Sequence, residues 1–232
     1  MLSYKATARV VGVLFIVATA AAIVGEMLLL PSIESTYLAE AASAEIRVIT
    51  GALLEVVLAI SVVGIAVMLF PVLKKQGDGM ALGYVGARTL EGVLVLGGAI
   101  SALLLLTLSR DYGATGAAGV EPLGDVLLAA REWTYWLGPM LMFSVSALIL
   151  YALLFRAHLV PNWLSIWGFI GGVLLLVRAV LEMYGVEFST VVQGIIAAPI
   201  GVNEMVLAVW LIFKGFNLST LGAVPEEEPN LA

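Results

Sequence analysis

The segment Met80–Leu108 reads MALGYVGARTLEGVLVLGGAISALLLLTL, and its charged residues are Arg88 and Glu91. A helix needs about 20 predominantly apolar residues to cross the hydrocarbon core of a bilayer. The segment meets that length in spite of its two charges. It therefore predicts a transmembrane helix that carries an arginine and a glutamate at membrane depth.

Similar apolar stretches recur along the chain and predict an all-α membrane bundle. Hydrophobic residues make up 62% of the chain and charged residues 12%, and the mean hydropathy is +1.08. Soluble domains are about half apolar and a quarter charged, so we expect one transmembrane domain over residues 1–223. The tail 224–232 is expected to be disordered and acidic. The six predicted helices are approximately Ala6–Leu30, Ile46–Phe70, Met80–Leu108, Trp133–Phe155, Pro161–Tyr184 and Thr190–Phe213.

The distribution of charge predicts the orientation of this bundle. One side holds basic residues, and the other is rich in acids although it also contains Arg47, Arg110 and Arg131. Because cytoplasmic loops carry an excess of Lys and Arg, both termini are predicted to be cytoplasmic. The basic residues of the cytoplasmic side are Lys5, Arg9, Lys74, Lys75, Arg156 and Lys214.

The longest predicted connection, 109–130, is compatible with two structures. Its second half, Glu121–Arg131, mixes apolar and charged residues. It is predicted either as a short interfacial helix or as an extension of the fourth transmembrane helix.

The composition excludes several kinds of site. The chain has no cysteine, so it has no disulfide, no thiolate nucleophile and no thiolate metal ligand. With His158 as its one histidine, it contains neither a bis-histidine haem site nor a His-Glu-x-x-His zinc motif. There is no P-loop, no Gly-x-Ser-x-Gly elbow and no basic patch for nucleic acid. No cofactor or metal is predicted.

Five glutamates lie within the apolar segments, against two arginines, Arg88 and Arg178. A charge at membrane depth costs roughly 2.5–3.5 kcal/mol on insertion scales and usually faces protein or water. The neutral carboxyl is the cheaper state away from water. We therefore expect some of these glutamates to be protonated, to bind a cation or to line a wet cavity; the alternative is that neutral carboxyls only hydrogen-bond between helices. The five are Glu26, Glu55, Glu91, Glu182 and Glu204.

Depth and spacing divide the charged residues into two candidate groups. Arg88 and Glu91 are three residues apart, and Arg178 and Glu182 four apart, so each pair shares a helix face. For the second pair, a self-neutralising contact that holds helices together is the favoured interpretation; for the first, that interpretation and a functional one both stay open. The predicted ligand- or proton-binding residues are Glu55, Arg88, Glu91, Asn203 and Glu204, and the secondary candidates near the outer side are Glu26, Arg178 and Glu182.

Two further patterns each allow two interpretations. Pro199 and Gly201 weaken the last helix just before Asn203. The weakened stretch either borders a cavity or is a simple kink. Helices one and two also match helices five and six, since Glu26-Met27 follows Gly12 at the spacing at which Glu182-Met183 follows Gly168. This match indicates either a parallel internal duplication or a chance similarity of apolar helices.

Several segments resemble the domain-of-unknown-function 4386 family (DUF4386), a family of prokaryotic membrane proteins. They are Arg9–Thr19, Gly83–Glu91, Pro161–Gly168, Asn203-Glu204 and Trp210–Gly215. The resemblance implies a similar multi-helix fold in a prokaryotic plasma membrane. It implies no activity and no catalytic residues.

These observations favour a binding or transport function over catalysis. The leading hypothesis is a membrane protein that binds or transports a small ligand, a lipid or a proton at the buried Glu/Arg site. An accessory or assembly subunit of a membrane complex is the second hypothesis, and a lipid-modifying enzyme the third, since no catalytic set is recognised. The expected partners are the lipid bilayer, a bound lipid or small molecule, and either further copies of the chain or a partner membrane protein.

Overall fold

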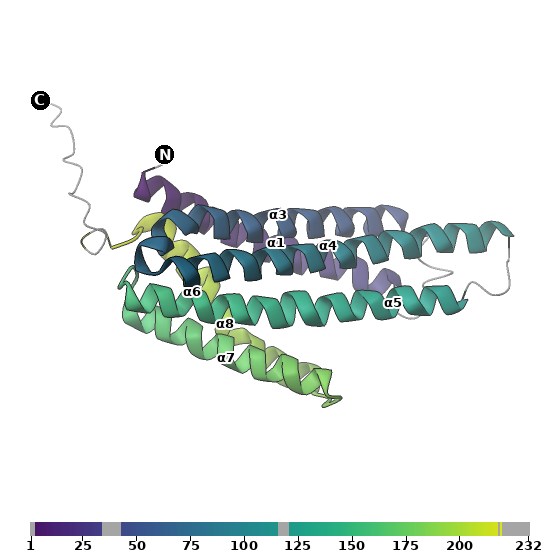
Figure 1. Cartoon of the computed structure of the whole chain (residues 1–232). Coiled ribbons are helices and arrows are strands. Elements are labelled where there is room, and N and C mark those ends of the chain that lie inside the picture. The colour runs from purple at the N-terminus through teal and green to yellow at the C-terminus, as the bar shows by residue number, and fades with distance from the viewer. Residues whose placement is uncertain (1–2, 34–42, 116–120, 218, 220–232) are drawn as a thin grey trace, which may run out of the picture.

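The chain folds into a bundle of long helices (Figure 1). The computed structural model describes residues 3–33, 43–115, 121–217 and 219; the predicted tail 224–232 lies outside them. Within the described part there is no strand, and six helices are long and apolar enough to cross a membrane. The all-α membrane bundle predicted from the sequence is thus confirmed. The elements are α1 (Tyr4–Ile33), α3 (Glu45–Leu73), η1 (Lys74–Gln76), α4 (Asp78–Thr115), α5 (Glu121–Tyr135), η2 (Trp136–Met142), α6 (Phe143–Arg156), α7 (Asn162–Met183) and α8 (Thr190–Phe213).

The helices follow one another as antiparallel neighbours, and the last returns to the first. α1 packs on α3, α3 on α4, and α4 on the long helix formed by α5, η2 and α6, which then packs on α7. α8 contacts both α7 and α1. At one end of the bundle α1, α4 and α7 begin and α3, α6 and α8 end. We call it the terminal end. Figure 1 shows the α7–α8 hairpin leaning away from α1, α3 and α4 towards the opposite end.

Close packing around α7 depends on its glycines. A Cβ atom at Gly171 would come 2.9 Å from the backbone nitrogen of Ile200, and one at Gly168 would overlap the ring of Tyr151. Both glycines therefore allow α7 to pack closely on its neighbours. Gly86 of α4 has no such role, because a Cβ there would meet nothing within 4 Å.

The fourth transmembrane helix begins well before the predicted Trp133. α5, η2 and α6 form one continuous helix from Glu121 to Arg156, so Glu121–Arg131 extends this helix. Pro139 lies in the π-helical segment η2, where a residue without a backbone N–H interrupts the regular hydrogen-bond ladder. The N–H of Phe143 accordingly donates to the carbonyl of Gly138, five residues back.

Candidate functional site

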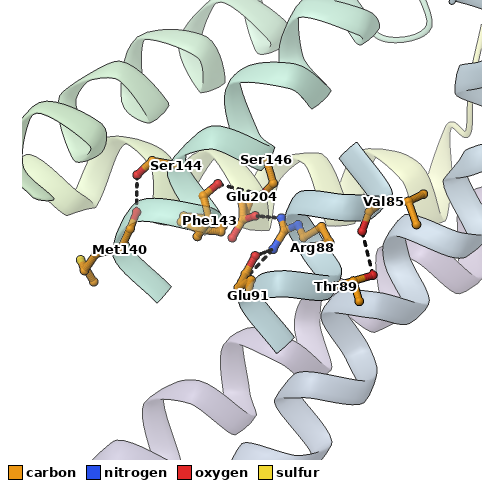
Figure 2. A network of polar contacts seen from close by, with 9 residues as sticks. All are labelled: Val85, Arg88, Thr89, Glu91, Met140, Phe143, Ser144, Ser146 and Glu204. Atoms are coloured by element: carbon orange, nitrogen blue, oxygen red, sulfur yellow. Dashed lines mark hydrogen bonds and ion pairs between the residues drawn. The ribbon is translucent and has the colours of Figure 1, made fainter. Parts of the chain in front are cut away.

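Helix α4 presents Arg88 and Glu91 one turn apart on its buried face. The side chain of Arg88 is 2% exposed and that of Glu91 is 5% exposed. Nη1 of Arg88 lies 3.2 Å from each carboxylate oxygen of Glu91 (Figure 2). Glu204 comes from α8, and its Oε1 lies 3.3 Å from Nη2 of the same guanidinium. We call these three residues the Arg88 cluster.

Two aromatic rings enclose the guanidinium of Arg88. Its Cζ lies 5.0 Å from the centre of the Phe143 ring and 5.8 Å from that of the Tyr84 ring. Both distances permit a favourable cation–π interaction, which gains strength where water is excluded. The positive charge of Arg88 is therefore held in place from α4 and α6 as well as by the two carboxylates.

The charges of the Arg88 cluster do not balance. Two carboxylates face one guanidinium, so with all three groups ionised the cluster carries a net charge of −1. Glu91 is enclosed and places both oxygens on Arg88, whereas the side chain of Glu204 is 13% exposed and places one oxygen there. Glu91 therefore acts as the main counter-ion of Arg88, and Glu204 is the surplus carboxylate.

Several buried polar atoms near this cluster have no hydrogen-bond partner among the described residues. Such groups normally find a partner, because leaving one unpaired costs about 1–3 kcal/mol. Asn203, a predicted site residue, uses its Nδ2 to donate to the carbonyl of Leu164 at 2.9 Å and keeps Oδ1 unpaired. The full set is Tyr84 Oη, Arg88 Nε, Tyr151 Oη, Ser165 Oγ and Asn203 Oδ1.

Glu55, predicted to join the central site, instead pairs with Arg131 of α5. Their closest atoms, Oε1 and Nη2, are 2.8 Å apart, and Nη1 of Arg131 reaches Oε2 at 3.2 Å. The same Nη1 also donates to the carbonyl oxygen of Gly98 at 2.9 Å. The sequence suggested that Arg131 lay only at the outer boundary. In the structure it belongs to the continuous helix Glu121–Arg156, where it neutralises Glu55 of α3.

The secondary candidates gather nearer the opposite end. Nε of Arg178 lies 2.9 Å from Oε2 of Glu182, as their spacing predicted, and its Nη1 donates to the backbone carbonyl of Gln193 at 3.2 Å. Glu26, although exposed, lies within electrostatic range of Tyr135, as do Arg178 and Glu182. Helices α1, α5 and α7 thus bring these three candidates into one region.

Sequence reasoning missed Tyr84, Tyr151 and Ser165. All three are fully or almost fully buried beside the predicted site. A phenol inside an otherwise apolar span was the available signal, because a buried hydroxyl needs a partner. Among the described residues, no group of three or more His, Cys, Asp or Glu side chains is arranged to hold a metal ion.

The Glu55–Arg131 pair yields a first prediction. Arg131→Met should lower the free energy of unfolding in detergent by about 1–2 kcal/mol, because it leaves Glu55 without its cation. This is below the effect of breaking a fully buried pair, since the two side chains remain 14% and 15% exposed. The double variant Glu55→Gln/Arg131→Gln, which removes both charges, should recover much of the loss. A single Arg131→Met variant as stable as wild type would contradict the prediction.

Comparison with known proteins identifies one family. A family model described as "Domain of unknown function (DUF4386)" matches residues 10–215. The matched region contains the Arg88 cluster, the Glu55–Arg131 pair and the Arg178–Glu182 pair. Neither a curated protein nor a solved structure shows significant similarity to the chain.

Proposed function

Because the chain belongs to the DUF4386 family, whose description names no activity, we propose a function from the geometry of its buried charges. The protein is a proton-binding transport protein of the plasma membrane, and Glu204 is the group that takes up and releases the proton. Both termini face the cytoplasm in this proposal, because all four lysines, Lys5, Lys74, Lys75 and Lys214, lie at the terminal end.

The observation that carries the proposal is the sharing of one guanidinium by two carboxylates. A proton on Glu204 brings the Arg88 cluster to zero net charge without disturbing the two contacts between Arg88 and Glu91. Loss of that proton leaves a surplus negative charge where water is scarce, which an incoming cation or a change in hydration would have to compensate. A site with these two states couples proton release to the binding of another species.

The position of Glu204 supports its role as the exchanging group. It belongs to α8, which includes Pro199 and leans away with α7 from the first three helices towards the opposite end (Figure 1). Arg88 and Glu91 both belong to the regular helix α4. A small movement of α8 would therefore change the contact between Glu204 and Arg88 and leave the Arg88–Glu91 contact intact.

Infrared spectroscopy tests the proposed proton. Wild-type protein in lipid nanodiscs at neutral pH should show the carbonyl stretch of a protonated carboxylic acid. Glu204→Gln should abolish it, and so should Glu91→Gln, because either change leaves one carboxylate for one guanidinium. The exposed Glu132 offers a control, since Glu132→Gln should leave the band unchanged. Absence of the band in wild type, or its survival in both cluster variants, would refute the proposal.

Chemical labelling then assigns the proton to one of the two carboxyls. Dicyclohexylcarbodiimide reacts with protonated carboxyl groups in apolar surroundings. Mass spectrometry should find the adduct on Glu204 and not on Glu91. In proteoliposomes that contain a pH-sensitive dye, Glu204→Gln should also abolish any proton flux seen with wild type.

A further inference from the structure

We infer that four buried polar side chains form a proton path between Glu204 and the terminal end of the bundle. The inference rests on the proposed function and adds the route and the side from which the proton arrives. The side chains are Tyr84 from α4, Tyr151 from α6, Ser165 from α7 and Asn203 from α8. We call this set the polar seam.

The members of the polar seam share an unusual feature: each is buried and leaves a polar atom unpaired among the described residues. A buried serine ordinarily satisfies its hydroxyl on the backbone of its own helix. Ser144 and Ser146 do so, at 2.6 and 2.8 Å from carbonyl oxygens (Figure 2). Ser165 is as deeply buried and makes no such bond. Its hydroxyl therefore remains available to a water molecule or a neighbouring group.

The four side chains are neighbours in space as well as alike in character. Tyr151 lies within electrostatic range of Glu204, Arg88 and Tyr84. Its ring packs across Gly168, which is three residues from Ser165 and so on the same face of α7. The bond from Asn203 to the carbonyl of Leu164 places Asn203 beside the residue before Ser165. The seam thus runs from the Arg88 cluster along the contact between α6, α7 and α8.

Ser165 is the member of the seam that lies closest to a helix end. It is in the first turn of α7, about 5 Å from Asn162, where this helix begins at the terminal end. Asn203 lies about 15 Å from the last residue of α8 and yet bonds to Leu164 near the start of α7, so α8 continues past the start of α7 at this end. The seam therefore reaches the terminal end at Ser165.

A pocket lies where the seam approaches this end. It has a volume of about 380 Å³, and its lining includes Pro161, Asn162 and Trp210. Asn162 begins α7, one turn before Ser165. Water in this pocket would be one helical turn from the last hydroxyl of the seam.

The hydroxyl groups of the seam suit proton transfer, and the amide oxygen of Asn203 can accept a hydrogen bond from one of them or from water. A hydroxyl accepts a hydrogen bond and donates one, so Tyr151 can receive a proton on its oxygen as its own proton passes to the next acceptor. Where two polar groups of the seam are too far apart for a direct hydrogen bond, a bridging water molecule connects them. After each transfer the phenol is restored and one proton has moved between Glu204 and the pocket. No oxidant or further reactant is needed.

The rate of protonation of Glu204 tests the path. After a rapid pH jump, time-resolved infrared spectroscopy follows the carboxylic acid band in wild type, Tyr151→Phe and Ser165→Ala. We expect both variants to slow the change about tenfold, the equivalent of one lost hydrogen bond, and to keep its final amplitude. Ser144→Ala, which removes a hydroxyl already bonded to its own helix, should keep the wild-type rate. Wild-type rates in both seam variants, or equal slowing in the control, would overturn the path.

Accessibility of an introduced thiol tests the side of entry. The chain contains no cysteine, so Ser165→Cys carries the single thiol of the protein. A small water-soluble thiol reagent should modify it from the terminal side of sealed proteoliposomes and leave the control Ser144→Cys unmodified. An unreactive Ser165→Cys, or one modified only from the opposite side, would contradict the proposed entry. If the carboxylic acid band itself is absent from wild type, the proposed function fails first, and the two failures are distinguishable.

Discussion

Replacing Arg88 by methionine is expected to destabilise the protein by about 3–5 kcal/mol, the usual effect of removing one partner of a buried ion pair. Arg88 is 2% exposed and is the counter-ion of both Glu91 and Glu204. Without it, two carboxyl groups remain in the core and lose the cation that each contacts among the described residues. Methionine approximates the length of the arginine stem, so the loss of charge accounts for most of the effect.

The prediction distinguishes the arginine sharply from its two partners. Glu91→Gln and Glu204→Gln each leave one positive and one negative charge, so each should cost much less than Arg88→Met. The triple variant Arg88→Met/Glu91→Gln/Glu204→Gln removes all three ionisable groups and should recover much of the stability of wild type. Denaturant unfolding in detergent measures these differences. Equal effects of Arg88→Met and Glu204→Gln would show that charge balance does not govern the cluster.

Gly168→Val is expected to destabilise the protein by about 3 kcal/mol, the upper end of the range for overpacking a well-packed core. A Cβ at this position would overlap three atoms of the Tyr151 ring, which is itself 1% exposed and has little room to move. The valine side chain must therefore push α6 and α7 apart or displace Tyr151 from the polar seam.

Gly201→Ala provides a matched control for this prediction. Gly201 also lies within a helix, but a Cβ there would meet nothing within 4 Å. Alanine should stabilise the helix at this position by about 0.5–1 kcal/mol, because glycine loses more conformational freedom on folding. Thermal unfolding in detergent should therefore move the two variants in opposite directions. A Gly168→Val variant as stable as wild type would mean that α6 and α7 do not pack as closely as the structure indicates.

The sequence was sufficient to predict the six membrane helices and their order. A transmembrane helix satisfies all its backbone hydrogen bonds within one segment, so a long enough apolar stretch specifies it locally. The sequence left open whether Glu121–Arg131 extends the fourth helix or forms a short interfacial helix, because this segment mixes charged with apolar residues. Arg131 lies inside the span because Glu55, 76 residues earlier, neutralises it, and a window along the chain does not contain that information. The internal duplication of helices one and two in helices five and six stays a prediction.

For the candidate site, too, the sequence determined one part and tertiary packing the rest. The spacing of Arg88 and Glu91 determines their contact, because residues three apart on a helix are neighbours. Tertiary packing alone decided that Glu204 contacts the guanidinium of Arg88 and that Glu55 pairs with Arg131 instead. It also decided that Tyr84, Tyr151 and Ser165 lie beside the Arg88 cluster. The reason is physical: the sequence specifies which charged side chains each helix carries and how far apart they are along it, whereas the distances that determine how charges on different helices neutralise one another arise only when those helices pack together.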